Sequence, residues 1–140
     1  MILGIGTDIA QVERFKSWLN YSEKQLLRVF SEQELEYCCD FKNKSKYRLE
    51  SLASRFAAKE SFFKALSATL VKLNLTQNKF SLLFTCQNIE VVKTTWDVPK
   101  LKVNWEAFEE KVGRKLSNFN VELSISHEKN YVVSYVLIWQ

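Results

Sequence analysis

The stretch YRLESLASRFAAKESFFKALS (residues 47–67) has the longest helical pattern in this 140-residue chain. Apolar residues recur in it at helical spacing between Leu49 and Phe63, which predicts a helix with one buried stripe. At ~100° per residue, Glu60 falls inside that stripe and Lys64 lies beside it one turn later. A carboxylate on a buried stripe is costly unless a cation or a metal ion pairs with it. Glu60 therefore belongs either to an i, i+4 ion pair with Lys64 or to a metal site.

The chain begins with MILGIGTDI (residues 1–9), a pattern rich in Ile and Leu that predicts a strand. Strand alternation places Gly4 and Gly6 on the same face as Asp8, and Leu3 is expected on the opposite face. The glycine positions carry no side chains, so a ligand or a neighbouring backbone can approach them closely. Asp8 either caps a helix that follows the strand or, together with the helical glutamate, binds Mg²⁺.

The rest of the chain mixes helices and strands without regular βα alternation, which indicates an α+β fold. Two capping boxes, SEKQ at residues 22–25 and SEQE at residues 31–34, predict helices that start near residues 23 and 32. We expect further helices over residues 11–19 and 105–116, and strands over residues 79–87, 88–96, 101–105, 121–127 and 131–139. The last two strands form a hairpin. At this length the whole chain, residues 1–140, is expected to be one domain.

Composition excludes several classes of protein. Three cysteines without a CxxC pair and a single histidine leave too few ligands for a zinc site. The same cysteine usage favours a reduced, cytoplasmic protein without structural disulfides. No apolar run approaches the roughly 20 residues of a membrane span, and the N-terminus lacks the basic region of a signal peptide. GIGTDI lacks the last glycine of GxGxxG, and there is no P-loop motif.

Positive charge is concentrated in one part of the chain. The net charge of +4 is too small to indicate a nucleic-acid partner. Residues 42–64, however, contain seven basic and only two acidic residues. Such a stretch suits a phosphorylated ligand or an acidic protein, although a solvated helix face has a similar composition.

Three segments together resemble one family, the holo-acyl-carrier-protein synthases, which are short-type 4′-phosphopantetheinyl transferases. The segments are GIGTDI with Arg14 after it, SRFAAKESFFKAL at residues 54–66, and SISHE at residues 124–128, in the family's order. The resemblance implies the 4′-phosphopantetheinyl transferase fold, in which a small antiparallel-rich sheet packs with a long central helix. It also implies a homotrimer with active sites between subunits.

The resemblance further implies an activity. Members transfer 4′-phosphopantetheine from coenzyme A to a serine of apo-acyl carrier protein, in the presence of Mg²⁺, and release adenosine 3′,5′-bisphosphate. The reaction supports fatty acid biosynthesis. The expected partners are therefore coenzyme A and an acidic carrier protein, with no nucleic acid and no membrane. Two alternatives stay open: the same chemistry on a polyketide or peptide-synthase carrier domain, and a non-catalytic module that binds an acidic protein.

Motif positions carry the family's roles onto individual residues. Asp8 and Glu60 are the implied metal ligands, and together with Lys64 they form the implied catalytic set. Glu60 is also placed to act as the base, directly or through a water on the metal. Arg14 is implied to meet the acidic recognition helix of the carrier protein. The residues implied to bind coenzyme A are Arg55, Lys64, His127, Lys46 and Arg48.

Overall fold

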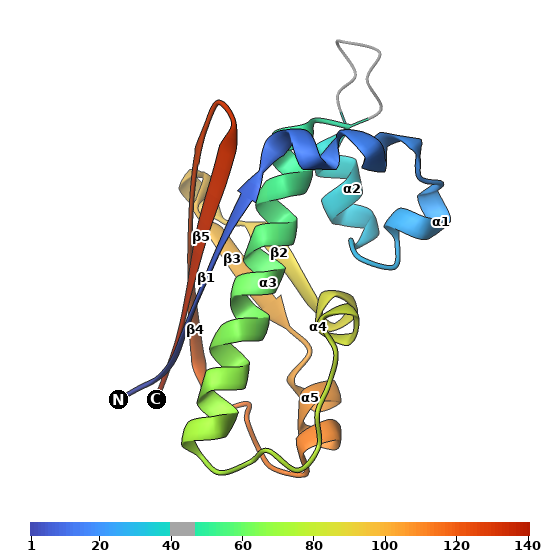
Figure 1. The fold of residues 1–140 in the computed structure, drawn as a ribbon. Helices are drawn as coiled ribbons and strands as arrows, with labels where there is room; N and C mark the ends of the chain where they lie inside the picture. Colours follow the sequence, from blue (N-terminus) through green and yellow to red (C-terminus); the bar gives the residue numbers. More distant parts are fainter. Residues whose placement is uncertain (40–46) are drawn as a thin grey trace.

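The structure, a computed structural model, describes residues 1–39 and 47–140. Figure 1 shows one long central helix lying along a three-stranded sheet, with the shorter helices on the side of the long helix that faces away from this sheet. In chain order the elements are β1 (Ile2–Gln11), the 3-10 helix η1 (Val12–Asn20), α1 (Glu23–Leu26), α2 (Glu32–Cys38), α3 (Leu49–Lys72), α4 (Leu82–Asn88), β2 (Ile89–Lys93), the 3-10 turn η2 (Thr95–Asp97), β3 (Pro99–Val103), α5 (Trp105–Val112), β4 (Asn120–Glu128) and β5 (Tyr131–Trp139).

Both sheets are antiparallel. The larger has the strand order β1-β5-β4, and the smaller consists of β2 and β3. The two ends of the chain meet, since Met1 and Gln140 bond to each other through their backbones. This arrangement confirms the expected α+β fold with antiparallel sheets and a long central helix. None of the helices in the described residues has the length and apolar character needed to cross a membrane.

Helix α3 is buried along most of its length, between two apolar clusters. Aromatic side chains of η1 and the loop before α2 cover its first half, where Phe15 and Phe30 are buried. Phe62 of α3 packs against Phe108 of α5 in the second cluster. On the sheet side, Ser134 of β5 donates a 2.8 Å hydrogen bond to the carbonyl of Ala57. The small residues on this side allow the helix and the sheet to lie close together.

The glycines of β1 face the backbone of α3. A Cβ atom at Gly6 would lie 1.9 Å from the carbonyl oxygen of Ser61, and one at Gly4 would lie 2.2 Å from that of Ala65. No side chain fits in either space, because atoms cannot approach so closely. The sequence allowed either a ligand or a neighbouring backbone at this face, and the structure shows that the backbone of α3 occupies it.

We expect Gly6→Ala to destabilise the protein strongly, because the new methyl group must push β1 away from α3. Overpacking of this kind costs about 3 kcal/mol or more where backbone atoms are in the way. The melting temperature should fall by roughly 10 °C, as measured by circular dichroism. Gly113→Asn is the control, since Gly113 caps α5 at φ +74° with open space around it and asparagine tolerates that conformation. Equal melting temperatures for the two variants would contradict this packing.

Three sequence-based expectations were wrong in detail. Leu3 is 3% exposed and Ile2 is 52% exposed, because the strand register shifts between Ile2 and Gly4 and turns Leu3 into the core. Residues 79–87 were expected to form a strand, but most of them lie in α4. The side chain of Ser81 caps this helix by accepting a hydrogen bond from the Phe84 amide. The expected helix over residues 105–116 ends at Val112, where Gly113 adopts a left-handed conformation.

Candidate active site

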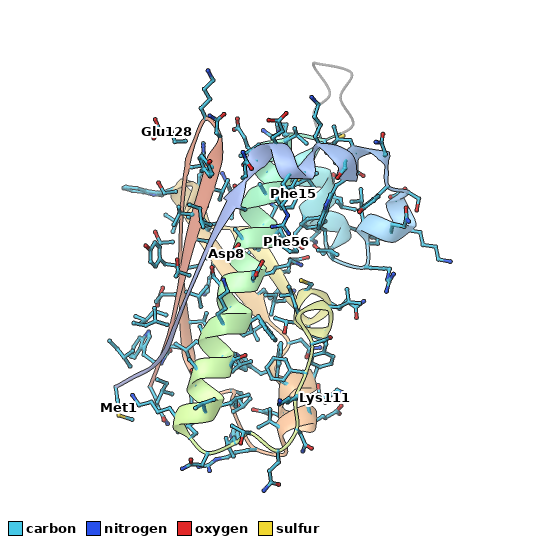
Figure 2. All side chains as sticks on the ribbon, viewed as in Figure 1. Met1, Asp8, Phe15, Phe56, Lys111 and Glu128 are labelled. Atoms are coloured by element: carbon cyan, nitrogen blue, oxygen red, sulfur yellow. The ribbon has the colours of Figure 1, made fainter. Side chains whose placement is uncertain are left out.

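Asp8, Glu60 and Lys64, the predicted catalytic set, lie together where β1 crosses α3. The Lys64 ammonium is 3.0 Å from Asp8 Oδ1 and 3.9 Å from Glu60 Oε1. It also donates a 3.0 Å hydrogen bond to the carbonyl of Thr7. Figure 2 shows Asp8 in the space between the strand and the helix. The Asp8 side chain is 10% exposed and that of Glu60 is 26% exposed, so both carboxylates remain partly accessible to solvent.

The alternative in which Asp8 is a helix cap is wrong. Strand β1 continues past it to Gln11, and Gln11 begins η1 without a side-chain capping hydrogen bond. The i, i+4 pair between Glu60 and Lys64 is present, but the lysine is nearer to Asp8. Two carboxylates thus point at a single cationic group, and the cluster carries one excess negative charge.

This donor set fits Mg²⁺. The ion takes oxygen ligands and is usually held by one or two carboxylates, with water and substrate phosphate oxygens in the other positions. Asp8 and Glu60 supply the carboxylates from two rigid elements, and their shared contact with Lys64 shows that both accept a cation in the same place. Among the described residues no group of three or more His, Cys, Asp and Glu side chains is placed to hold a metal. A complete protein cage, as calcium or structural zinc would need, is therefore absent from that part of the chain.

A second, cationic pocket lies at the N-terminal end of α3. It has a volume of about 340 Å³ and contains three of the predicted coenzyme A ligands, Arg48, Arg55 and His127. Arg55 is only 5% exposed, and its Nε has no hydrogen-bond partner among the described residues. Lys46, the remaining predicted ligand in this region, lies outside the described residues. The full lining is Tyr37, Arg48, Glu50, Ser51, Ser54, Arg55, Val91, Lys93, Asp97, Pro99, Ile125 and His127.

Three cationic side chains of this pocket pack against the ring of Tyr37. The guanidinium carbon of Arg55 is 4.0 Å from the ring centroid, that of Arg48 is 5.1 Å away, and the Lys93 ammonium is 5.0 Å away. A hydrogen bond with Lys93, helped by the nearby positive charges, lowers the pKa of the Tyr37 hydroxyl below its usual value despite partial burial. Sequence reasoning missed Tyr37 and Lys93 as pocket residues, although Tyr37 closes the FSEQELEY segment at residues 30–37.

The pocket and the catalytic cluster do not meet within one chain. None of Asp8, Glu60 and Lys64 lines the pocket. Arg55 and Lys64 face opposite sides of α3, at ~180°, and are separated by about 13.5 Å along the helix axis. The structure therefore brings three of the predicted site residues together at one place and three others, Arg48, Arg55 and His127, at another.

The basic stretch at residues 42–64 is not a continuous surface patch. Lys59 is completely buried, and its ammonium is 2.7 Å from Glu34 Oε1. It also donates hydrogen bonds of 2.8 to 3.0 Å to the carbonyls of Val29, Cys86 and Ile89. The capping box predicted at Glu34 is present. Because this box already accounted for the glutamate, its ion pair with Lys59 was not predicted. Lys42 and Lys44 fall outside the described residues.

Arg14, the predicted contact for a carrier protein, is exposed on η1. Its guanidinium carbon is 5.4 Å from the ring centroid of Phe56 and 5.6 Å from that of Phe15. Figure 2 shows the two rings together at the junction of η1 and α3, where they are 5.5 Å apart. The guanidinium of Arg14 thus packs against both rings. Further exposed basic residues nearby are Lys16, Lys24 and Arg28.

An α+β chain with a paired-carboxylate and lysine cluster, together with a buried arginine in a cationic pocket, has the features of an enzyme for phosphorylated ligands. The family model for the 4′-phosphopantetheinyl transferase superfamily matches residues 4–136. The chain belongs to this superfamily.

Relatives named holo-[acyl-carrier-protein] synthase match almost the whole chain. The protein from Borreliella burgdorferi is 38% identical over 134 residues, which are 96% of each chain. The protein from Clostridium tetani is 33% identical over 138 residues, which cover 99% of this chain and 96% of the relative.

Solved structures agree with this assignment. The Chronobacterium ammoniagenes ACPS–CoA complex has a TM-score of 0.73 at 26% identity, and the match covers 97% of this chain and 96% of that one. The holo-(acyl-carrier-protein) synthase of Bacillus anthracis in complex with CoA (3′,5′-ADP) has a TM-score of 0.68 at 28% identity, with 99% and 96% covered.

Proposed function

We propose that this chain is a holo-acyl-carrier-protein synthase, which transfers 4′-phosphopantetheine from coenzyme A to a serine of apo-acyl carrier protein. The observation that carries the proposal is the Asp8–Lys64–Glu60 cluster, which joins two carboxylates and a cation at an accessible position. Membership of the superfamily and the names of the relatives support it. The reaction supports fatty acid biosynthesis in the cytoplasm.

The residues of the cluster divide the chemistry between them. The serine oxygen attacks the β-phosphorus of the diphosphate, the bond from this phosphorus to the bridging oxygen breaks, and adenosine 3′,5′-bisphosphate leaves. Glu60 accepts the proton of the serine hydroxyl, since it is the more exposed of the two carboxylates. Lys64 moves from Asp8 to the diphosphate and stabilises its charge. Asp8 and Glu60 would hold Mg²⁺, which neutralises the diphosphate when it is bound.

A homotrimer explains why the predicted site residues fall into two groups. Coenzyme A bound to both groups of one chain would have to pass around α3, because Arg55 and Lys64 face opposite sides. In the proposed assembly, the adenosine phosphate end occupies the cationic pocket of one copy, and the diphosphate reaches the catalytic cluster of the next. The outer face of the sheet suits an interface, since Ile5, Ile9 and Tyr135 are each more than half exposed there.

The experiment that tests the function is a direct transfer assay. The protein is incubated with apo-acyl carrier protein, coenzyme A and Mg²⁺, and the carrier is weighed by intact-mass spectrometry. We expect a phosphopantetheine adduct that depends on coenzyme A and disappears with a chelator. Apo-carrier domains from polyketide and peptide synthases, tested side by side, identify the preferred acceptor. Salt-sensitive binding without an adduct on any carrier would instead support the non-catalytic module.

We expect Arg14→Glu to weaken use of the carrier protein while leaving coenzyme A binding intact. The substitution reverses a charge that faces an acidic partner, and such charges act mainly on association. KM for the carrier should rise about tenfold or more, whereas KM for coenzyme A stays the same. Lys115→Glu is the matched control, since it reverses an exposed charge that lies after α5 and not on η1. An unchanged KM for the carrier would exclude Arg14 from the docking surface.

A further inference from the structure

We propose that Tyr37 and Lys93 complete a phosphomonoester site in the cationic pocket and make the enzyme select coenzyme A over its 3′-dephospho form. The inference rests on the proposed function, in which this pocket receives the adenosine end of coenzyme A. Neither residue lies in the three segments that carry the family resemblance. Both follow from the contacts around the buried guanidinium of Arg55.

The orientation of Arg55 depends on Tyr37. Its guanidinium carbon lies 4.0 Å from the centre of the phenol ring, and the hydrogen bond that Nη1 donates to the carbonyl of Ser51 is long, at 3.4 Å. The buried Nε has no acceptor among the described residues. A buried polar group without a partner is costly, and the planar arginine fork matches a phosphate group. Tyr37 thus packs against the guanidinium and leaves its Nε donor available for an anion.

Lys93 supplies a further positive charge to the pocket. It lies at the end of β2, with its ammonium 5.0 Å from the Tyr37 ring centroid and 3.8 Å from Asp97 Oδ1. A hydrogen bond with Lys93, together with the positive charges of Lys93, Arg55 and Arg48, lowers the pKa of the Tyr37 hydroxyl. Asp97 is 87% exposed at the hairpin tip, so this long ion pair is weak. An incoming phosphate can replace the Asp97 carboxylate as the partner of Lys93.

The number of charges fits a phosphomonoester. Such a group carries a charge close to −2 at neutral pH, and removing it leaves a neutral hydroxyl. Arg48, Arg55 and Lys93 all approach the same ring, and His127 lies on the pocket wall. Glu50 and Asp97 also line the pocket and would repel an anion unless these cations face it. The Tyr37 hydroxyl adds a hydrogen bond at the place where the cations converge.

The test compares coenzyme A with 3′-dephospho-coenzyme A in the transfer assay, using wild type, Tyr37→Phe, Lys93→Gln and Asp97→Asn. Wild type should prefer coenzyme A in kcat/KM. We expect this preference to fall about tenfold in Lys93→Gln and several-fold in Tyr37→Phe, since each loses a contact to a charged group. Asp97→Asn should increase the preference, because it frees Lys93. If the Lys93–Asp97 pair were only structural, Lys93→Gln and Asp97→Asn would change the preference for coenzyme A in the same direction.

Two measurements keep this inference separate from the proposed function. Calorimetric binding of adenosine 3′,5′-bisphosphate and of AMP to the same four proteins reports the pocket without any chemistry. Lys100→Gln, on the adjacent strand and outside the pocket, is the control for loss of a lysine. If wild type transfers phosphopantetheine but uses both donors equally, or if Tyr37→Phe and Lys93→Gln keep the full preference, the inference is wrong. If wild type transfers nothing, the proposed function is wrong.

Discussion

Glu60→Gln should lower kcat for phosphopantetheine transfer by at least about 100-fold, which is the scale on which single charged groups at a reacting centre act. The substitution keeps the size and shape of the side chain, which is 26% exposed, so folding should be little affected. It removes one of the two proposed metal ligands and the proposed base together. Asp8→Asn should have a similar effect on activity through the metal alone.

The two variants separate the roles of the carboxylates. If Glu60 is both ligand and base, raising the Mg²⁺ concentration should restore part of the activity of Asp8→Asn and little of that of Glu60→Gln. The assay is the rate of holo-carrier formation by intact-mass spectrometry. Glu110→Gln, an exposed glutamate on α5, is the matched control. Full activity of Glu60→Gln with a native circular dichroism spectrum would remove Glu60 from the active site.

Lys59→Met should cost about 3–5 kcal/mol of the free energy of unfolding, the usual penalty for removing one partner of a buried ion pair. The Glu34 carboxylate would keep its hydrogen bonds from the amides of Ser31 and Val91 but would lose its only counter-charge among the described residues. Three backbone carbonyls would lose their ammonium donor as well. The midpoint of urea unfolding measures the loss. Lys16→Met, an exposed lysine on η1, should change it by less than about 0.5 kcal/mol.

A double-mutant cycle tests whether the loss comes from the unpaired charge. Glu34→Gln removes the charge that Lys59→Met leaves without a partner. The double variant should therefore be at least about 1 kcal/mol more stable than the sum of the single losses predicts. Purely additive losses would mean that the two groups do not interact, in conflict with the 2.7 Å contact between them.

Sequence patterns predicted the elements that depend on local periodicity. The helix that contains Glu60, the first strand, both capping boxes and the C-terminal hairpin all appear close to their expected positions. The segment before β2 was mistaken for a strand, because a short apolar run fits either element and Ser81 supplies the cap that makes it a helix. The helix with Glu60 continues to Lys72, beyond the expected Ser67.

The candidate site was also predictable in part. The helical position of Glu60 and its spacing to Lys64 indicated an ion pair or a metal site, with Asp8 as the second candidate ligand, and the structure places these three residues together. The count of basic residues at 42–64 wrongly included Lys59 as a charge available to a ligand. A lysine on a helix is normally exposed, and nothing near Lys59 in the sequence indicates its partner. That partner, Glu34, is 25 positions away and had already been explained by its capping box.

Local sequence is sufficient to predict the periodic elements and the glycine pair of β1, because each depends on neighbours a few positions away. The charged residues can be read from it directly. The packing of α3 against β1 is a different matter, since it places Ser61 and Ala65 against the glycines and brings Lys64 to Asp8. The same packing turns Arg55 away toward Tyr37. These contacts join residues far apart along the chain, and their geometry depends on how closely two backbones approach, which no local pattern contains.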